Sequence, residues 1–169
     1  MPEKIAIIGP ESSGKSTLTQ QLAAHFNEPF VPEYGRLYLE QNGPAYSFDD
    51  LKIIADKMLT IEAEKREAAH RFLFCDTDLI MIKVWYQVKY NTVPKKLIDQ
   101  IAANPYSFYF ICYPDLPWEA DPLRENPNRR RELFDRYLKE VTKLGTQYKI
   151  IKGENRLPKA VSYLSAHFI

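Results

Sequence analysis

The sequence has only two cysteines, almost no net charge and no apolar run long enough to cross a membrane. Cys75 and Cys112 each lie within an apolar, strand-like run, which predicts buried free thiols in a reducing compartment. Lys and Arg total 23 and Asp and Glu total 22, so a general nucleic-acid-binding surface is not expected. The first residues, MPEKIAII, carry an acid and a base and do not resemble a signal peptide. These absences favour a cytoplasmic protein with no nucleic-acid or membrane partner.

The chain also lacks internal repeats and low-complexity linkers, and residues 1–169 are interpreted as a single domain. Strand-like apolar runs alternate with helical patterns, which predicts an α/β fold with a parallel sheet of about five strands and helices on both faces. Ligands of such sheets lie at the carboxyl ends of the strands. Strands are expected at residues 4–8, 29–32, 71–75, 107–112 and 148–152, and helices at 15–26, 34–41, from Ser47 onward, 79–90, 94–103, 128–143 and 158–168.

A phosphate-binding motif lies between the first expected strand and the first helix. Gly9-Pro-Glu-Ser-Ser-Gly14-Lys15-Ser16 matches the pattern G-x-x-x-x-G-K-[ST]. Glycines let the backbone point its N–H groups at a phosphate, and the helix N-terminus and the lysine add positive charge. A serine hydroxyl at this position is a candidate Mg²⁺ ligand. We therefore predict that ATP and Mg²⁺ are bound by Gly9, Pro10, Glu11, Ser12, Ser13, Gly14, Lys15, Ser16 and Thr17.

Acidic residues follow the second and third expected strands. Asp76 ends the run FLFCD, where P-loop proteins place a second magnesium-organising group, so we predict a metal-binding and catalytic role for it. Capping of the next helix is the alternative, and for Asp78 both capping and substrate binding stay open. Glu33 could take the proton of a hydroxyl nucleophile, hydrogen-bond sugar hydroxyls, or simply begin a helix near the helix dipole.

An arginine-rich segment follows the fourth expected strand. Residues 114–127 contain four prolines, which predicts a stiff loop at the ligand-binding edge, and Arg124, Arg129 and Arg130 lie in it or just beyond it. Planar guanidinium groups bind two phosphate oxygens at once. We predict a lid in which Arg124 and Arg130 assist phosphoryl transfer and Arg129 contacts the nucleotide. The alternative for the run 129–131 is a solvent-exposed helix face paired with acidic neighbours.

Four segments together resemble the ribosylnicotinamide kinase domain of the NadR-type proteins of bacterial NAD salvage. They are GPESSGKSTLTQQLAAHFN, PEYGRLYLE, DTDLIMIKVW and PWEADPLRENPNRRRELF, and the similarity runs from Ile5 to about Leu164. The E-Y-G-R, D-T-D and W-(E/D)-x-D-x-x-R elements are more specific than the phosphate loop. The resemblance implies a P-loop fold of the nucleoside and nucleotide kinase type. It also implies transfer of the ATP γ-phosphate to the 5′-hydroxyl of nicotinamide riboside, which gives nicotinamide mononucleotide.

Such an acceptor implies a particular kind of site, because it carries a cationic pyridinium ring on a ribose. The ring favours an aromatic face, and the hydroxyls and the charge favour carboxylates. Trp118 is a candidate face that could instead pack in the core, and Trp85 is one that could instead pack between helices. The substrate-binding residues expected from the resemblance are Glu33, Tyr34, Asp78, Trp85, Asp115 and Trp118.

The chain departs from the NadR-type pattern in two places. Only a few residues precede the first expected strand, so nucleotidyltransferase and DNA-binding domains are not expected. In the lid, Asp121-Pro122 stands where Asp-Gly is expected, so the lid conformation and the substrate choice of the family are not carried over at this point. A kinase for another nucleoside or small metabolite stays open, as does a nucleotide-binding regulatory module. A GTPase is not favoured, because the guanine-reading sequence N-K-x-D is absent.

Overall fold

Three apolar runs form the centre of a five-stranded parallel sheet. They are β1 (Glu3–Ile8), β3 (Phe72–Asp76) and β4 (Phe108–Cys112), and every residue of β3 and β4 is buried. Strands buried on both faces are expected to be continuously apolar, and these are so apart from Glu3 and Lys4 at the start of β1 and Asp76 at the end of β3. The short strand β2 (Phe30–Val31) pairs with β3, and β5 (Tyr148–Ile151) pairs with β4. The order across the sheet is β2-β3-β1-β4-β5, and the computed structural model describes all residues from 1 to 169.

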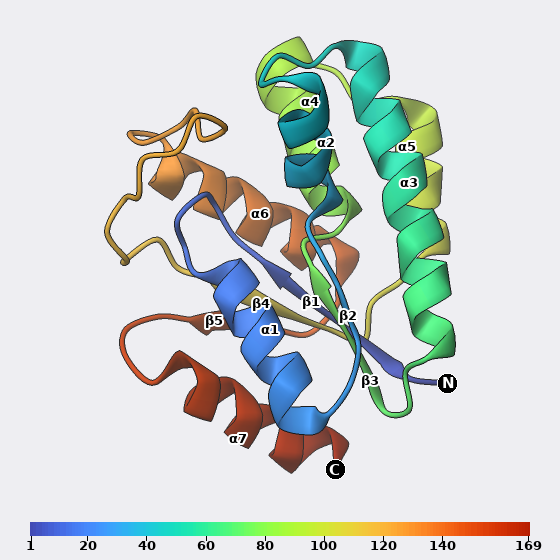
Figure 1. Cartoon of the computed structure of the whole chain (residues 1–169), viewed down its shortest axis with the longest axis vertical. Coiled ribbons are helices and arrows are strands. Elements are labelled where there is room, and N and C mark those ends of the chain that lie inside the picture. The colour runs from blue at the N-terminus through green and yellow to red at the C-terminus, as the bar shows by residue number, and fades with distance from the viewer.

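Helices cover both faces of this sheet (Figure 1). On one face α1 (Lys15–Phe26) and α7 (Arg156–Phe168) pack over Ile5, Ile7 and the phenylalanines of β3 and β4. The remaining helices are α2 (Tyr34–Asn42), α3 (Phe48–Glu67), α4 (Leu79–Tyr90), α5 (Lys95–Ala103) and α6 (Arg130–Leu144). The last four of these helices contribute to a larger apolar cluster on the other face of the sheet.

Local sequence signals account for several helix boundaries. Ser47 and Asp50 form the expected capping box at the start of α3, with hydrogen bonds of 3.1 and 2.7 Å. Asn27 ends α1 in the left-handed conformation that asparagine tolerates. The last helix begins at Arg156 rather than at Pro158, because a proline within the first turn removes no helical hydrogen bond.

The predicted α/β fold is confirmed in its elements. All five expected strands and seven expected helices are present, and most boundaries differ by one or two residues. Cys75 and Cys112 are buried free thiols, as predicted. None of the helices combines the length and the apolarity that a bilayer span requires.

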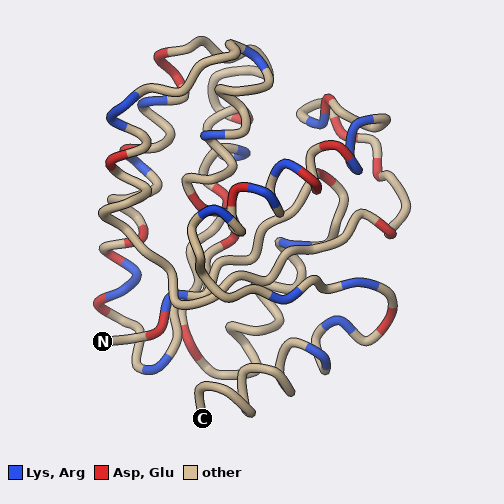
Figure 2. The backbone as a smooth tube through the Cα atoms, turned by 180° about the vertical axis from the view of Figure 1, so that it is seen from behind, with Lys and Arg blue, Asp and Glu red and all other residues tan.

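Positive and negative side chains are interspersed along the chain (Figure 2). Both signs also occur in residues 113–129, the segment between β4 and α6, which we call the lid. The lid reaches over the carboxyl edge of the sheet, near the loop that joins β1 to α1 (Figure 1). The fold therefore brings the phosphate motif, the strand-end carboxylates and the arginine-rich segment to one edge.

Candidate functional site

The phosphate motif forms a tight loop between β1 and α1, and two of its glycines are required by their surroundings. Gly14 has a φ of 80°, which side-chain-bearing residues rarely adopt. At Gly9, with a φ of 156°, an added Cβ would lie 2.7 Å from Ser13 Oγ and 2.8 Å from the Cys112 carbonyl oxygen. The loop thus keeps its backbone close to the end of β4, at the N-terminus of α1, where an anion is stabilised.

Lys15, the lysine of this loop, faces the carboxylate that follows β2. Its Nζ lies 3.1 Å from Glu33 Oε2, and the two side chains are only 11% and 15% exposed. Burial alone would lower the pKa of Lys15, but the charges of Glu33 and Asp76 outweigh it, so the pKa is raised above its ordinary value. Lys15 is therefore a cation at neutral pH, within reach of any group that binds the loop.

Asp76 lies at the end of β3, the strand between β1 and β2. Burial, together with the charge of Glu33, raises its pKa to about 6, against the opposing effects of Lys15 and of a hydrogen bond from Ser16. Its Oδ1 is buried without a hydrogen-bond partner. A buried carboxylate oxygen with no partner is costly, which marks this oxygen as available for a further ligand.

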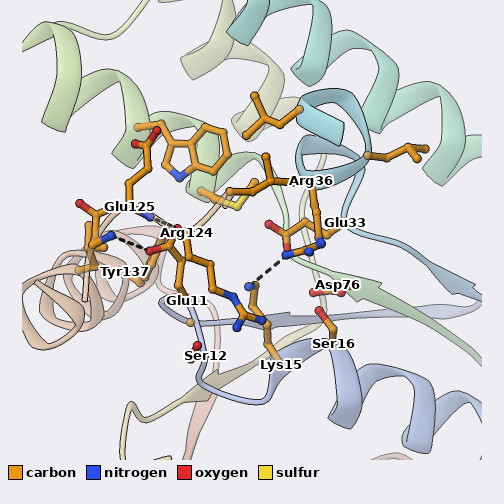
Figure 3. A pocket seen from close by; sticks show the side chains of 18 of the residues that line it. Glu11, Ser12, Lys15, Ser16, Glu33, Arg36, Asp76, Arg124, Glu125 and Tyr137 are labelled. Atoms are coloured by element: carbon orange, nitrogen blue, oxygen red, sulfur yellow. Dashed lines mark hydrogen bonds and ion pairs between the residues drawn. The ribbon is translucent and has the colours of Figure 1, made fainter. Parts of the chain in front are cut away.

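A cavity of about 680 Å³ opens beside these groups at the carboxyl edge of the sheet. Figure 3 shows Lys15, Ser16 and Asp76 at its base, with Glu11 and Arg124 on the lid side and Arg36 beside Glu33. Such a volume is in the range of small-molecule sites. Of the residues predicted from the sequence, the cavity is lined by Gly9, Glu11, Ser12, Lys15, Ser16, Glu33, Asp76, Trp85, Arg124 and Arg129.

The half of the cavity away from the phosphate loop is aromatic. Trp85 stacks on Tyr46, with ring centroids 5.2 Å apart and an interplanar angle of 25°. The Lys89 ammonium lies 3.7 Å from the centroid of the Tyr46 ring. Tyr137 also lines this half, and in α6 it shares a helix face with Leu133 and Arg129, four and eight residues earlier. That spacing is the signal from which Tyr137 could have been predicted, whereas Tyr46 precedes α3 in a loop and has no such signal.

The structure does not bring every predicted residue to the cavity. Trp118 lies outside its lining, 5.8 Å from the Arg130 guanidinium carbon. Arg130 Nη1 donates instead to the carbonyl oxygens of Ser12 and Leu116, at 3.2 and 2.8 Å. Arg130, predicted to assist transfer, thus holds the lid against the phosphate loop, and Trp118, predicted to stack on the substrate, lies against Arg130.

Asp115 and Asp78, predicted to bind the substrate, also lie outside this lining. Asp115 pairs with Arg156 and accepts a hydrogen bond from the Gly153 N–H. Asp78 is buried and caps α4, accepting from the N–H of Ile80 at 3.0 Å and from the Tyr109 hydroxyl at 2.6 Å. Each carboxylate is already engaged within the protein, and for Asp78 helix capping is the alternative that the sequence left open.

Four further predicted residues also lie outside the cavity lining. Tyr34 begins α2 and packs against the core beside Tyr38 rather than in the cavity lining. Pro10, Ser13 and Thr17 belong to the phosphate loop and α1 but do not line the cavity. Sequence reasoning missed Arg156, which donates to the carbonyl oxygen of Ser13 at 2.7 Å and so supports the loop from behind.

A phosphate loop at the N-terminus of a helix, on a parallel sheet with strand order β2-β3-β1-β4-β5, defines a P-loop nucleotide-binding fold. Residues 4–156 match the family model of the AAA domain, and the chain belongs to that family. Among curated proteins, the trifunctional NAD biosynthesis/regulator protein NadR of Salmonella typhimurium is 31% identical over 147 residues. NadR of Escherichia coli is 32% identical over 127 residues. These matches confirm the resemblance to NadR-type proteins that the sequence suggested.

The alignments cover 82% and 71% of this chain but only 35% and 30% of the two relatives, so the chain spans about a third of their length. Among solved structures, NadR in complex with NR superposes with a TM-score of 0.80 at 20% identity, covering 99% of this chain and 52% of that one. Deoxyadenosine kinase from M. mycoides with bound dATP gives 0.59 at 14% identity, covering 96% and 99%. The fold is thus that of nucleoside and nucleotide kinases.

Proposed function

We propose that this protein is an ATP-dependent kinase that phosphorylates the 5′-hydroxyl of nicotinamide riboside. One observation carries the proposal: a single cavity joins the phosphate loop to a half lined by carboxylates and stacked aromatic rings. Such a cavity suits a phosphoryl donor at the phosphate loop and a nucleoside acceptor whose flat ring lies in the aromatic half. The similarity to NadR over most of the chain supports this acceptor.

The residues present fit a magnesium ion. Mg²⁺ prefers oxygen ligands and is usually held by one or two protein groups together with phosphate oxygens and water. Ser16 and the unpartnered Oδ1 of Asp76 provide two such oxygens beside the phosphate loop. A bound Mg²⁺ would neutralise charge that develops on the transferred phosphoryl group.

The protein's own groups then divide the chemistry between them. The loop N–H groups and Lys15 hold the donor phosphates, and Arg124 and Arg129 line the same cavity as further cations. Glu33 pairs with Lys15 and lines the same cavity as the aromatic rings, which supports a role for it as acceptor of the proton from the acceptor hydroxyl. The hydroxyl oxygen bonds to the γ-phosphorus as the bond to the β–γ bridging oxygen breaks. ADP leaves, and the proton stays on Glu33.

The aromatic half suits the pyridinium ring of the acceptor. The Trp85–Tyr46 pair offers a preformed face for a flat cation, and Glu33 and Glu125 line the same cavity with negative charge. A cytoplasmic location is also part of the proposal, because both thiols are free and buried.

The test is an ADP-release assay with a panel of acceptors. Nicotinamide riboside should be phosphorylated with a higher kcat/KM than adenosine, cytidine, uridine or thymidine. If one of these nucleosides is preferred in direct competition, the acceptor is wrong although the kinase stands. If no acceptor is phosphorylated in the presence of Mg²⁺ and ATP, a nucleotide-binding regulatory module takes its place.

A further inference from the structure

The lid is attached to the molecule on two opposite sides of the cavity. On the phosphate side, the N–H of Glu119 donates to Ser12 Oγ at 3.2 Å. The Glu11 carboxylate accepts from the N–H groups of Glu125 and Asn126 at 3.2 and 3.0 Å. These contacts hold the lid to the loop that would carry the donor.

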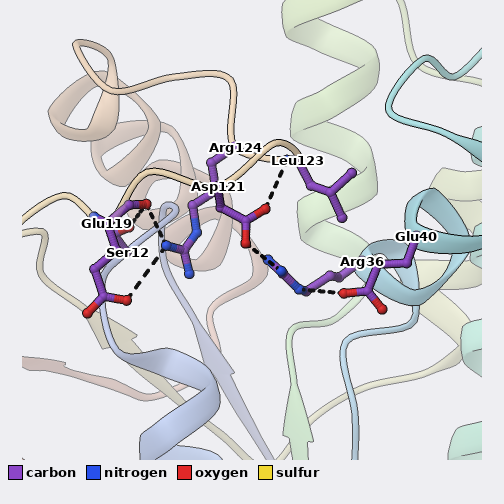
Figure 4. A network of polar contacts seen from close by, with 7 residues as sticks. All are labelled: Ser12, Arg36, Glu40, Glu119, Asp121, Leu123 and Arg124. Carbon is purple, nitrogen blue, oxygen red and sulfur yellow. Dashed lines mark hydrogen bonds and ion pairs between the residues drawn. The ribbon is translucent and has the colours of Figure 1, made fainter.

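On the acceptor side, the lid is attached to α2 by one ion pair. Arg36 Nη2 donates to Asp121 Oδ2 at 2.6 Å, between residues 85 positions apart in the sequence. Figure 4 shows this contact together with the attachment at Ser12, so the lid contacts both the phosphate loop and α2. The hydrogen bond from Arg36 lowers the pKa of Asp121, so both members of the pair are charged at neutral pH.

The same aspartate also shapes the lid. Its Oδ1 accepts from the N–H of Leu123 at 2.9 Å, and its carbonyl oxygen accepts from the N–H of Arg124 at 3.0 Å. Pro122 occupies the second position of the resulting turn, where proline is favoured. The Asp-Pro departure noted in the sequence therefore stabilises a turn that starts at the ion pair and ends at Arg124.

Arg124 is the residue whose position depends on this turn. It lines the cavity, and its Nη1 donates to the Glu119 carbonyl oxygen at 2.6 Å. Arg36 lies in the first turn of α2, three residues after Glu33, which is the N-cap of this helix. The ion pair thus connects the helix that follows the acceptor-side carboxylate to the turn that ends at Arg124.

We propose that Arg36 and Asp121 are positioning residues, whose ion pair latches the lid to α2 and holds Arg124 over the phosphate loop during transfer. This latch rests on the proposed kinase function. Arg36 and Asp121 are 39% and 21% exposed, and exposed ion pairs contribute little to stability. Its loss should therefore affect the rate of transfer and the lid, and should leave the unfolding temperature unchanged.

Asp121→Asn removes the ion pair with Arg36 but keeps the turn at residues 121–124. The asparagine Oδ1 still accepts from the Leu123 N–H, but its amide NH₂ then faces the guanidinium, where two donors cannot bond. The matched control is Asp99→Asn, which removes the exposed partner of Lys95 on α5, away from the cavity. At saturating ATP and nicotinamide riboside, Asp121→Asn should lower kcat about tenfold, and the control by less than twofold. Exchanging the charges, with Arg36→Asp and Asp121→Arg together, should restore at least part of the rate.

A second measurement reports on the lid without catalysis. Amide hydrogen exchange over residues 119–126 should be faster in Asp121→Asn than in the parent and in the control. If exchange there equals that of the parent, the latch does not exist; if kcat equals that of the parent, the latch does not position the transfer. If the parent protein phosphorylates no acceptor, the proposed function is refuted. The hydrogen-exchange measurement then still tests whether the ion pair holds the lid.

Discussion

Trp85 and Trp118 are both candidates for the aromatic face that contacts the acceptor, and the structure favours Trp85. Its ring is fixed between Tyr46 and α2, because an added Cβ on Gly35 would lie 3.5 Å from the Trp85 ring. Trp118 lies outside the cavity lining, beside Arg130. We therefore expect Trp85→Ala to impair use of the acceptor and Trp118→Ala to leave it nearly unchanged.

The size of the effect follows from the contact that is lost. A cation over an aromatic ring contributes from about 0.5–1 kcal/mol when exposed to about 2 kcal/mol when water is excluded. The Trp85 ring is part of the cavity wall and partly buried, so the upper half of this range applies. Because each 1.4 kcal/mol is a factor of about ten, kcat/KM for nicotinamide riboside should fall roughly 10- to 30-fold. The KM for ATP should change by less than about twofold, since Trp85 is not part of the phosphate loop.

Steady-state kinetics with each substrate varied in turn would measure this difference. Truncating a partly buried tryptophan also costs stability, up to about 3 kcal/mol, so thermal unfolding must show that Trp85→Ala is folded at the assay temperature. Trp85→Phe is the matched variant: it keeps an aromatic face and should lose about threefold or less. The reasoning is refuted if Trp118→Ala raises the acceptor KM more than Trp85→Ala does.

Four further predictions concern ionisable side chains with little exposure. Lys15→Ala should abolish transfer and leave the fold intact, and near-normal turnover at saturating ATP would contradict the role of the loop. Asp76→Asn should raise the Mg²⁺ requirement at least tenfold, whereas Glu33→Gln should lower kcat with ATP binding unchanged by calorimetry; a Glu33→Gln variant equal to the parent would make Glu33 a helix-start residue only. Burial raises the pKa of Asp78 from 3.8 to about 7. Between these two pH values the folded chain binds a proton that the unfolded chain has released, so the free energy of unfolding falls as the pH rises from about 4 to about 7. The unfolding temperature of the parent should fall more between pH 5 and pH 8 than that of Asp78→Asn, and equal slopes would refute the shift.

The fold was predictable because its signals are local. The runs FLFC in β3 and FYFIC in β4 are apolar or aromatic throughout, and the capping box at Ser47 lies within four residues of sequence. The phosphate loop is a contiguous motif, and strand-end carboxylates are expected at the same edge in any parallel sheet. These features require no knowledge of which distant segments meet.

The contacts of the lid side chains were not predictable, because residues adjacent in sequence make different contacts there. Arg129 lines the cavity, whereas the next residue, Arg130, donates to backbone carbonyl oxygens. No periodicity distinguishes two adjacent arginines at the junction of a proline-rich loop and a helix. Arg156 is a related case, since its contact with Ser13 joins residues 143 positions apart.

The order of the strands, more than their presence, builds the catalytic end of the cavity. Because β3 lies between β1 and β2, Asp76 is placed between the phosphate loop and Glu33, and both of its neighbours act on its pKa. Lys15 can then reach Glu33 across the end of β3, which gives the 3.1 Å ion pair. Exchanging β2 with β5 in the order would leave every motif intact but would separate Glu33 from Asp76 by the width of β1 and β4. Strand patterns alone do not specify this order, so the convergence of Lys15, Asp76 and Glu33 is a property of the topology.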